Sequence, residues 1–276
     1  MTESLSHSAR ATLTRCARKY KYQYVDELEP KGTSKPLRMG SAYSDALEHW
    51  TVDAAYDFYA ELFMSASNNT DMQYLKEELA VVVALADTYM QLVPKHEREY
   101  EFNLDNGFNG FIDGYMDDYT LVENKCLSQW NTMREDALAL DDQVTGYIAA
   151  WHLTKNIPVE DITLQYHVAL KPMIRQKKSE SNVEFEARLA EVIYSDPTKH
   201  HIHCETSRTQ QQVAEWLDSL DVSKKLMDMY KEDGSYPMNT SNCLLYNSKC
   251  PFMDVCITGN EQLLEDNFQR KEKRNG

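Results

Sequence analysis

"GFIDGYMDDYTLVENKCLS", residues 110–128, predicts two strands joined by a short turn, with charged side chains inside both strands. If the turn has three residues (117–119), Asp113 lies opposite Glu123 on one face of the hairpin. Side chains alternate along a strand, so Lys125 shares that face with Glu123. A two-residue turn would place Asp113 on the other face. The hairpin therefore brings two carboxylates and a lysine together on the condition that its turn has three residues.

This set of side chains suits a metal-assisted reaction. Two neighbouring carboxylates repel each other unless a positive charge lies between them. Mg²⁺ typically binds through one or two carboxylates and keeps several of its waters. A nearby lysine can orient an attacking water or stabilise charge that develops on a phosphate. The pattern fits hydrolysis of a phosphodiester, although a surface hairpin with solvated charges is the commoner explanation of so short a motif.

A helix predicted over residues 137–154 adds two polar side chains. Its segment "QVTGY" places Gln143 and Tyr147 four residues apart, and residues at this spacing share one face of a helix. A glutamine amide and a tyrosine hydroxyl can hold a phosphate or a nucleotide. The alternative is an ordinary half-buried helix face.

The alternation of helical and strand patterns predicts an α/β fold, with a mixed central β-sheet flanked by helices, N-terminal helices and a C-terminal cysteine-rich loop region. Hydrophobic residues make up 42% of the 276 residues, which is enough for a core. We expect a single domain over residues 1–276, with a helical part at 1–95, a sheet core at 96–206 and a helix and tail at 207–276. We predict helices at 8–25, 40–64 (opened by Gly40 and Ser41), 71–93, 137–154, 184–194 and 209–231, and strands at 99–104, 110–116, 120–127, 161–170 and 200–205.

The net charge of −15 argues against a nucleic-acid partner, because phosphate contacts need lysine and arginine. The charge is uneven, however. Residues 1–40 contain eight basic and four acidic residues, a net charge of +4, so the remainder carries −19. This basic N-terminal segment could face phosphates.

The first residues have no apolar leader, and the longest apolar run, residues 79–86, is too short to span a bilayer. We therefore expect no membrane association and a cytoplasmic location. In that compartment the six cysteines are expected to be reduced, and so buried, catalytic or metal-bound.

Three cysteines cluster in the C-terminal segment. Cys243, Cys250 and Cys256 make an incomplete set, since zinc and iron–sulfur clusters usually take four ligands. Cys16, within the basic segment, is the best candidate for the fourth ligand, and the site would then join the two ends of the chain. The spacing lacks the C-x2-C of zinc ribbons, which favours a cluster over zinc. Scattered reduced thiols are the alternative, and Cys126, Cys204 and the histidines of residues 200–203 are expected to be solvated or in the core.

Taken together, these motifs resemble the PD-(D/E)XK nucleases of the RecB-like branch, especially the group with a four-cysteine iron–sulfur cluster. That group includes AddB-type nuclease domains and CRISPR-associated and phage exonucleases. "SHSARATLTRCARKYKYQYV" (6–25) is similar to the first motif, "GFIDGY" (110–115) with "VENK" (122–125) to the catalytic hairpin, and "QVTGY" (143–147) to the Gln-x-x-x-Tyr motif. The resemblance runs from about residue 5 to 258 with the motifs in order, and it implies a restriction-endonuclease-like core.

The resemblance also implies a role for each residue. It implies that Asp113 and Glu123 bind Mg²⁺ or Mn²⁺ together with the main-chain carbonyl of Asn124, and that Lys125 activates or orients the water. It implies that the helical pair Gln143 and Tyr147 contacts DNA or supports the site. It further implies that a [4Fe–4S] cluster, with zinc as the less favoured occupant, is held by Cys16, Cys243, Cys250 and Cys256.

One position departs from the pattern. The family often has Gly-x-x-x-His on the second helix, with the histidine reaching the metal, whereas "GSAYS" places Ser44 there. Glu48 shares a face with Ser44 and could substitute, while His49 points elsewhere. The upstream glutamate of the family corresponds to Glu99 or Glu101.

These inferences predict a Mg²⁺- or Mn²⁺-dependent deoxyribonuclease, an exonuclease acting on linear or single-stranded DNA ends in recombination, repair or phage DNA processing, in a bacterial or phage-infected cell. Other recombination or replication proteins are its expected partners. The alternative is a catalytically weak DNA-binding or adaptor module of the same fold within a larger complex, which Ser44 and the acidic surface favour. A third possibility is a scaffold protein stabilised by zinc.

Overall fold

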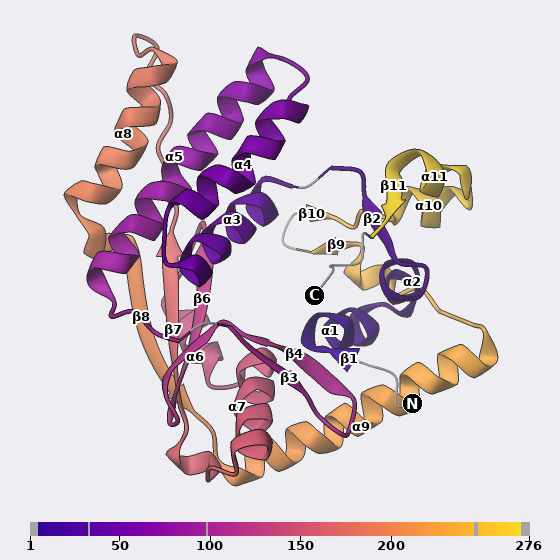
Figure 1. The fold of residues 1–276 in the computed structure, drawn as a ribbon. Helices are drawn as coiled ribbons and strands as arrows, with labels where there is room; N and C mark the ends of the chain where they lie inside the picture. Colours follow the sequence, from indigo (N-terminus) through magenta and orange to yellow (C-terminus); the bar gives the residue numbers. More distant parts are fainter. Residues whose placement is uncertain (1–4, 33, 98, 246–247, 272–276) are drawn as a thin grey trace. The chain divides into compact units, whose positions relative to one another are not determined.

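The structure is a computed structural model that describes residues 5–32, 34–97, 99–245 and 248–271. Contacts within the chain group it into two compact units (Figure 1). The terminal unit comprises Met1–Thr33, Asn103–Gly110 and Ala214–Gly276, and the central unit comprises Ser34–Phe102 and Phe111–Val213. The predicted α/β class, with helices and a mixed sheet, is confirmed.

The central unit is built on a four-stranded sheet of order β5-β6-β7-β8. Antiparallel pairing joins β5 (Gly114–Asp117) to β6 (Thr120–Leu127). The strand β7 (Thr163–Leu170) runs parallel to β6, and β8 (His201–Ser207) runs antiparallel to β7. A parallel pair needs a crossover connection, and the helical segment between β6 and β7 supplies it.

Register separates the residues of β6 between the two faces of this sheet. Glu123 pairs with Tyr166, while the next residue, Asn124, pairs with His167 on the opposite face. The Asn124 face is covered by helix α5 (Asn69–Leu92), because the ring of Tyr89 lies 5.4 Å from that of His167. The Glu123 face is therefore left for other elements.

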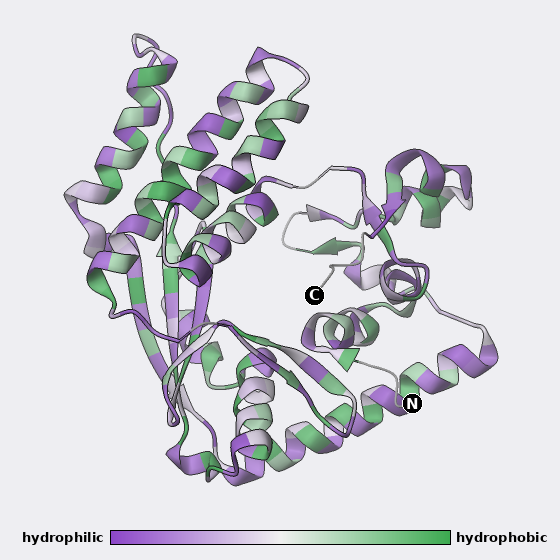
Figure 2. Ribbon diagram, viewed as in Figure 1, coloured by the Kyte–Doolittle hydropathy of each residue, from purple (hydrophilic) through white to green (hydrophobic). Residues whose placement is uncertain are grey.

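Helices α3 (Lys35–His49), α4 (Asp53–Ser65), α5 and α8 (Asn182–Ser195) pack together and share one core (Figure 1). Polar and apolar residues alternate along α5 and α8 in Figure 2, as expected of helices with one buried face. An ion pair lies inside this layer. The buried carboxylate of Glu78 accepts from Arg38 Nη2 at 2.7 Å and Nε at 3.0 Å, and from the Tyr59 hydroxyl at 3.2 Å.

The helix predicted over residues 40–64 is wrong in two respects. It is two helices, because Trp50 adopts a left-handed conformation, with φ of 53°, and ends α3. It also begins earlier, at Lys35, so Gly40 lies inside α3 and does not open it.

The helix predicted over residues 137–154 is also two helices, α6 (Thr132–Leu138) and α7 (Asp142–Lys155). Side-chain caps explain both starts. Asn131 accepts from the amide of Arg134, and Asp141 accepts from the amide of Val144. The remaining helices, at 71–93, 184–194 and 209–231, and the strands at 99–104, 161–170 and 200–205 are confirmed with shifted ends, and the strand at 120–127 is confirmed with the predicted ends.

The hairpin does not have the three-residue turn on which the shared face of Asp113 and Glu123 was made conditional. Asp117 pairs with Thr120, so the turn has two residues, yet Tyr115 pairs with Leu121. Met116 is the extra residue of a β-bulge, and this insertion restores the register that a two-residue turn would have shifted. The predicted strand 110–116 is also split at Asp113, between β4 (Phe108–Ile112) and β5.

The terminal unit begins with a helical segment that breaks at one residue. The predicted helix 8–25 is α1 (His7–Arg15), α2 (Ala17–Tyr20) and a π-helical turn (Lys21–Val25). Cys16 interrupts it with an extended backbone, φ −162° and ψ 108°. Helix α9 (Gln210–Asp233) lies along this segment, because Arg10 donates to Ser219 Oγ at 2.7 Å and to Ser223 Oγ at 3.2 Å.

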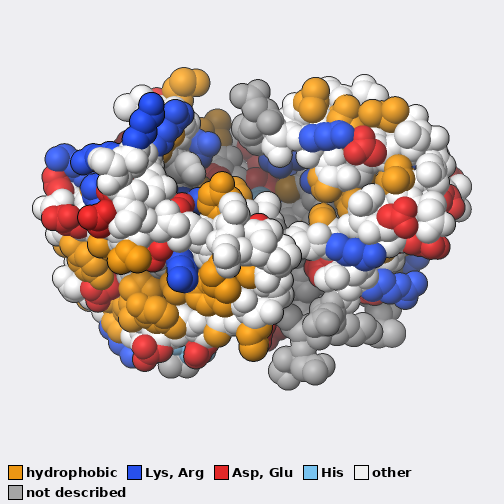
Figure 3. All heavy atoms as spheres, turned by 90° about the horizontal axis from the view of Figure 1, so that it is seen from above, with side chains coloured by type: hydrophobic (Ala, Val, Ile, Leu, Met, Phe, Trp, Pro, Cys, Tyr) orange, Lys and Arg blue, Asp and Glu red, His pale blue; other side chains and the backbone are white. Residues whose placement is uncertain are grey.

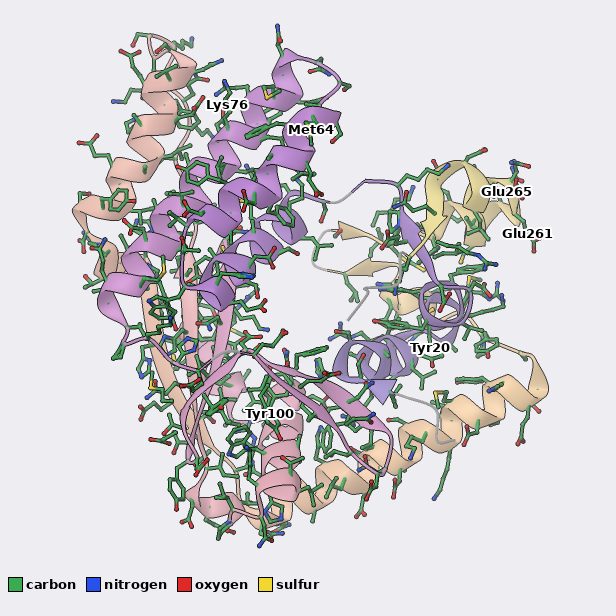
Figure 4. The ribbon with its side chains drawn as sticks, viewed as in Figure 1. Tyr20, Met64, Lys76, Tyr100, Glu261 and Glu265 are labelled. Carbon is green, nitrogen blue, oxygen red and sulfur yellow. The ribbon has the colours of Figure 1, made fainter. Side chains whose placement is uncertain are left out.

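Tyr20, labelled in Figure 4, makes a further contact between these helices, since its hydroxyl lies 3.1 Å from Met227 Sδ.

The strand β1 (Leu5–Ser6) pairs in parallel with the first residues of β4, and β3 (Tyr100–Asn103) completes that sheet. The rest of the terminal unit consists of short elements, namely β2 (Leu28–Pro30) paired with β11 (Phe268–Arg270), β9 (Leu244–Leu245) paired with β10 (Ser248–Lys249), α10 (Met253–Thr258) and α11 (Gln262–Asn267). Short 3-10 turns occupy Val159–Asp161, Pro197–Lys199 and Thr240–Asn242. In the described residues no helix has the length and apolar character needed to cross a bilayer.

Two glycines of the central unit allow a matched test of this packing. A Cβ on Gly114 would lie 2.5 Å from His96 Nδ1 and 2.7 Å from the Glu97 carbonyl oxygen, whereas a Cβ on Gly40 would meet nothing within 4 Å. We expect Gly114→Ala to lower the free energy of unfolding by about 1–3 kcal/mol through overpacking. Gly40→Ala should raise it by about 0.5–1 kcal/mol, because alanine is the better helix former. Urea denaturation measures both, and a Gly114→Ala variant as stable as the parent would contradict the close approach.

Candidate active site

The carboxylate of Asp113 is fixed by the backbone of the neighbouring strand. Asp113 lies at the bend between β4 and β5, and its Oδ2 accepts from the amide of Asn124 at 2.8 Å. Because the bulge restores the register, this bond places Asp113 beside Glu123, as predicted. The side chain of Asn124 itself belongs to the opposite face of the sheet.

Glu123 is fully buried in the middle of β6 and forms an ion pair with the Lys125 ammonium. Burial, and then the nearby charge of Asp113, raises the pKa of Glu123 to about 8, even though Lys125 acts in the opposite direction. For Lys125 burial alone would lower the pKa, but Glu123 and Asp113 outweigh it and raise the pKa above the ordinary value. The site therefore holds two carboxylates that repel each other and one ammonium that stays charged.

Helix α7 brings Gln143 and Tyr147 close to the carboxylates of the hairpin. Gln143 Nε2 donates to the hydroxyl of Tyr147 at 2.7 Å, so the two side chains do share a face. Burial, followed by the charges of Glu123 and Asp113, raises the pKa of Tyr147 well above its ordinary value. The structure thus brings Gln143 and Tyr147 to the carboxylates of the hairpin.

Two further residues border this face and were not anticipated. Tyr166 pairs with Glu123 across β6 and β7, and the ring of Trp130 stacks on it at 5.7 Å. Burial raises the pKa of Tyr166, while Lys125 lowers it and Glu123 and Asp141 raise it. The alternation of "DITLQYHVAL" could have indicated Tyr166, since it puts Leu164, Tyr166 and Val168 on one face.

Helix α3 carries the position of the missing histidine, and a substitute role for Glu48 stays a prediction. Ser44 is exposed and Glu48 is half-buried, while His49 Nδ1 contacts the carbonyl of Asp45 at 2.9 Å and so points elsewhere, as predicted. Tyr43 of α3 is influenced electrostatically by Asp113. Its pKa is raised by burial and then by Tyr89, Cys126 and Asp113. Of the two upstream glutamates, Glu99 contributes to the raised pKa of Tyr147.

The four predicted cysteine ligands line one cavity in the terminal unit. Cys250 donates its amide to the carbonyl of Cys243 at 2.9 Å, and the amide of Asn239 lies 3.5 Å from Cys16 Sγ. Burial raises the pKa of Cys256, Arg18 lowers it, and the other three thiols raise it further. The cavity is lined by Cys16, Cys243, Cys250 and Cys256 together with Arg15, Lys19, Asn239 and Asn242, among others.

Cys126 and the histidines His167, His201 and His203 lie on the face of the sheet opposite Glu123. Cys126 packs against the core of the helical layer, as predicted, and burial raises its pKa to about 11. His203 Nδ1 lies 3.1 Å from His167 Nε2. The pKa of His167 is lowered to about 3 by burial and by the histidines around it, and burial lowers that of His201 to about 4. These two rings are therefore neutral at physiological pH.

The donor atoms fit the implied metals in kind. Carboxylate oxygens suit Mg²⁺ and Mn²⁺, and four thiols suit an iron–sulfur cluster or zinc. Among the described residues, however, no three His, Cys, Asp or Glu side chains stand close enough together to hold a metal ion. In both places binding would require the side chains to converge on the ion.

Comparison with protein families matches residues 4–257 to the PD-(D/E)XK nuclease superfamily. The chain belongs to this superfamily. The match spans the hairpin, the α7 pair and all four clustered cysteines, and nucleases of this superfamily generally use divalent metals such as Mg²⁺. The likeness to the iron–sulfur branch stays a prediction.

Two solved structures are similar to this PD-(D/E)XK chain. One is a candidate exonuclease of Eubacterium rectale, with a TM-score of 0.55 and 12% identity, covering 94% of each chain. The other is a phage-related exonuclease of Haemophilus somnus 129PT, with a TM-score of 0.41 and 15% identity, covering 85% of this chain and 98% of that one. The first shows a shared fold. The comparison with curated proteins found no match.

The buried glutamate makes stability depend on pH in a definite direction. Because its pKa is raised from 4.5 to about 8, the folded chain holds the Glu123 proton more tightly than the unfolded chain does. This contribution to stability is complete below pH 4.5 and is lost as the pH rises to about 8. We expect the free energy of unfolding of the metal-free protein to fall across that window, by up to about 1.4 kcal/mol per pH unit.

Glu123→Gln carries no titrating proton and should lack this part of the slope. Urea denaturation in the presence of a chelator, at several pH values, compares the parent with the variant. Parallel profiles for the two proteins would contradict the raised pKa.

Proposed function

We propose that this member of the PD-(D/E)XK superfamily is a Mg²⁺- or Mn²⁺-dependent deoxyribonuclease that degrades DNA from its ends. The observation that carries the proposal is the pair of carboxylates, Asp113 and the fully buried Glu123, with the Lys125 ammonium beside them. Burying two like charges this closely is unfavourable unless a cation joins them, and the superfamily generally uses such cations.

Each side chain has a distinct part in the reaction. Asp113, Glu123 and the main-chain carbonyl of Asn124 would hold the divalent cation, which when bound lowers the pKa of water and stabilises charge on the phosphate. Lys125 is protonated, since its pKa is raised by its two carboxylate neighbours. It therefore serves better to orient the water and to stabilise the developing negative charge than to remove a proton.

The helical pair faces the substrate side of this arrangement. The Gln143 amide and the Tyr147 hydroxyl are hydrogen-bonded to each other and lie near the carboxylates. They would position a phosphate or nucleotide of the strand that is cut. The stacked rings of Trp130 and Tyr166 border the same face and offer an apolar surface to a base.

Action on DNA ends and a role in recombination, repair or phage DNA processing complete the proposal, with recombination or replication proteins as partners in a bacterial or phage-infected cytoplasm. The Eubacterium rectale structure, which is named as an exonuclease, shares the fold of this chain, and this shared fold is its support for exonuclease activity. On the face shown in Figure 3, basic and acidic side chains lie among apolar ones. With a net charge of −15, productive contact with DNA depends on a few basic residues, and the N-terminal segment supplies several.

Substitution of the three hairpin residues tests the catalytic assignment. We expect Asp113→Ala, Glu123→Ala and Lys125→Ala each to lower Mg²⁺- or Mn²⁺-dependent cleavage by at least about 100-fold, because each removes a charge from the site. Digestion of end-labelled linear and circular DNA measures this, and DNA binding in Ca²⁺ is measured in parallel. Asp118→Ala is the matched control, because it removes an exposed carboxylate from the turn of the same hairpin.

Full activity in any of the three variants would remove that residue from the mechanism. A second function, a catalytically weak DNA-binding or adaptor module, is favoured by Ser44 in place of the family's histidine. It predicts that the parent protein binds DNA in Ca²⁺ and cuts neither linear nor circular DNA in Mg²⁺ or Mn²⁺.

We further propose that Cys16, Cys243, Cys250 and Cys256 hold a [4Fe–4S] cluster. Their common cavity supports this, and so does the break in the first helix at Cys16, where the extended backbone takes the residue out of the helical pattern. The cluster would be structural, since it would join the N-terminal helix to the C-terminal segment. Zinc would use the same thiols, but it is colourless, so an absorption spectrum distinguishes the two.

Cys250→Ser tests the cluster, because metal binding by four thiolates is coupled to folding. We expect the iron content to fall from about four atoms per chain to near zero and the melting temperature to fall by several degrees. Anaerobic purification, iron analysis and thermal unfolding measure this. Cys126→Ser is the control, because Cys126 packs against the core of the other unit. Unchanged iron and melting temperature in Cys250→Ser would show that Cys250 is no ligand.

A further inference from the structure

Arg208 is a buried arginine at the end of β8, and its side chain is only 3% exposed. A guanidinium has five N–H donors in a rigid plane, and here each of the five hydrogen bonds ends on a different acceptor. Nε donates to Thr145 Oγ1 at 2.7 Å, Nη1 to Thr206 Oγ1 at 2.8 Å and the Ser207 carbonyl at 2.8 Å, and Nη2 to the carbonyls of Leu138 at 2.8 Å and Asp141 at 3.2 Å.

These acceptors belong to two elements. Thr206 and Ser207 are the last residues of β8. The other three surround the start of α7: Leu138 ends α6, Asp141 is the N-cap of α7, and Thr145 lies in its first turn. The Arg208 side chain therefore joins the sheet to the N-terminal turn of the helix.

That turn carries Gln143 of the proposed active site, and Tyr147 follows in the next turn. Thr145 lies midway in sequence between Gln143 and Tyr147, while Glu123 and Lys125 lie on β6, which is linked to β8 through β7. The helical pair and the sheet residues can work together only while the distance between α7 and the sheet stays fixed. Toward the other end of α7, Trp151 Nε1 donates to the carbonyl of Asp118 in the hairpin turn at 2.8 Å.

We infer that Arg208 is a positioning residue of the active site, which holds the first turn of α7 so that Gln143 and Tyr147 face Glu123 and Lys125. It touches neither metal nor DNA in this role. A lysine cannot replace it, because an ammonium has three donors and no planar fork, so acceptors on both elements would be left unpaired. A displacement of about 1 Å at a reacting group can slow an enzyme by roughly 100-fold.

The kinetic test of this role rests on the proposed nuclease function. We expect Arg208→Lys to lower the cleavage rate at saturating DNA by about 10- to 100-fold, with Mn²⁺ affinity within about twofold of the parent. Asp113 and Glu123 belong to the hairpin and not to the helix that is released. Thr145→Val, which removes one acceptor while keeping the shape, should act in the same direction more weakly, and Thr145→Ser should restore the parent rate.

A double-mutant cycle separates positioning from general destabilisation. If Arg208 acts through the helical pair, Arg208→Lys should have little further effect in a Gln143→Ala background, so the two losses are not additive. Arg38→Met is the matched control, because it removes a half-buried arginine of the same unit whose partner is Glu78 of α5. Its effect on rate should be small and additive with that of Gln143→Ala.

Hydrogen exchange provides a readout that needs no catalysis. We expect Arg208→Lys and Thr145→Val to speed exchange of the amides of residues 144–147, and Arg38→Met to leave them close to the parent. Additive losses in the cycle, or unchanged exchange in α7, would overturn the inference. A parent protein without nuclease activity would contradict the proposed function instead, and exchange would then decide the role of Arg208. Should Arg208→Lys fail to fold, the Thr145 variants answer the same questions.

Discussion

The central constraint of this structure is the burial of Glu123 beside Asp113 within a hydrogen-bonded sheet. A carboxylate away from water is unfavourable unless it is neutralised or paired, and the chain provides one ammonium for two carboxylates. The Asn124 amide, which stabilises the charge of Asp113, comes from the strand that also carries Glu123 and Lys125. The strand register therefore fixes the spacing of these groups, and a cation would be the missing partner.

Much of this arrangement could be predicted because it depends on local rules. The identity of β6, the shared face of Glu123 and Lys125, and the shared face of Gln143 and Tyr147 follow from the periods of strands and helices. The turn length could not be predicted, since nothing in "MDDY" distinguishes a three-residue turn from a two-residue turn with a bulge at Met116. Asp113 and Glu123 do share a face, but a two-residue turn with a bulge at Met116 produces the register that a three-residue turn would have given.

Other features depend on contacts between residues distant in sequence, and these left no readable pattern. Besides its neighbours Thr206 and Ser207, Arg208 bonds to Leu138, Asp141 and Thr145, about 60 to 70 positions away. The left-handed Trp50 that divides α3 from α4 is a residue type that rarely adopts φ above zero, so propensity favours one continuous helix there. Tertiary packing, and not local conformational preference, determines the bonds of Arg208 and the conformation of Trp50.

The two units differ in the size of their apolar cores, and the four clustered cysteines lie in the unit whose C-terminal part has few buried apolar residues. The central unit has a four-stranded sheet and a large shared core. The C-terminal part of the other unit has strands of two or three residues and helices of six, with Phe252, Val255 and Phe268 as its buried apolar residues in the described range 248–271. So small an apolar cluster rarely keeps a segment folded without a disulfide or a metal. The segment has three cysteines that line one cavity with Cys16 of the N-terminal helical segment, so the proposed metal centre would supply the stabilisation that the small apolar cluster lacks.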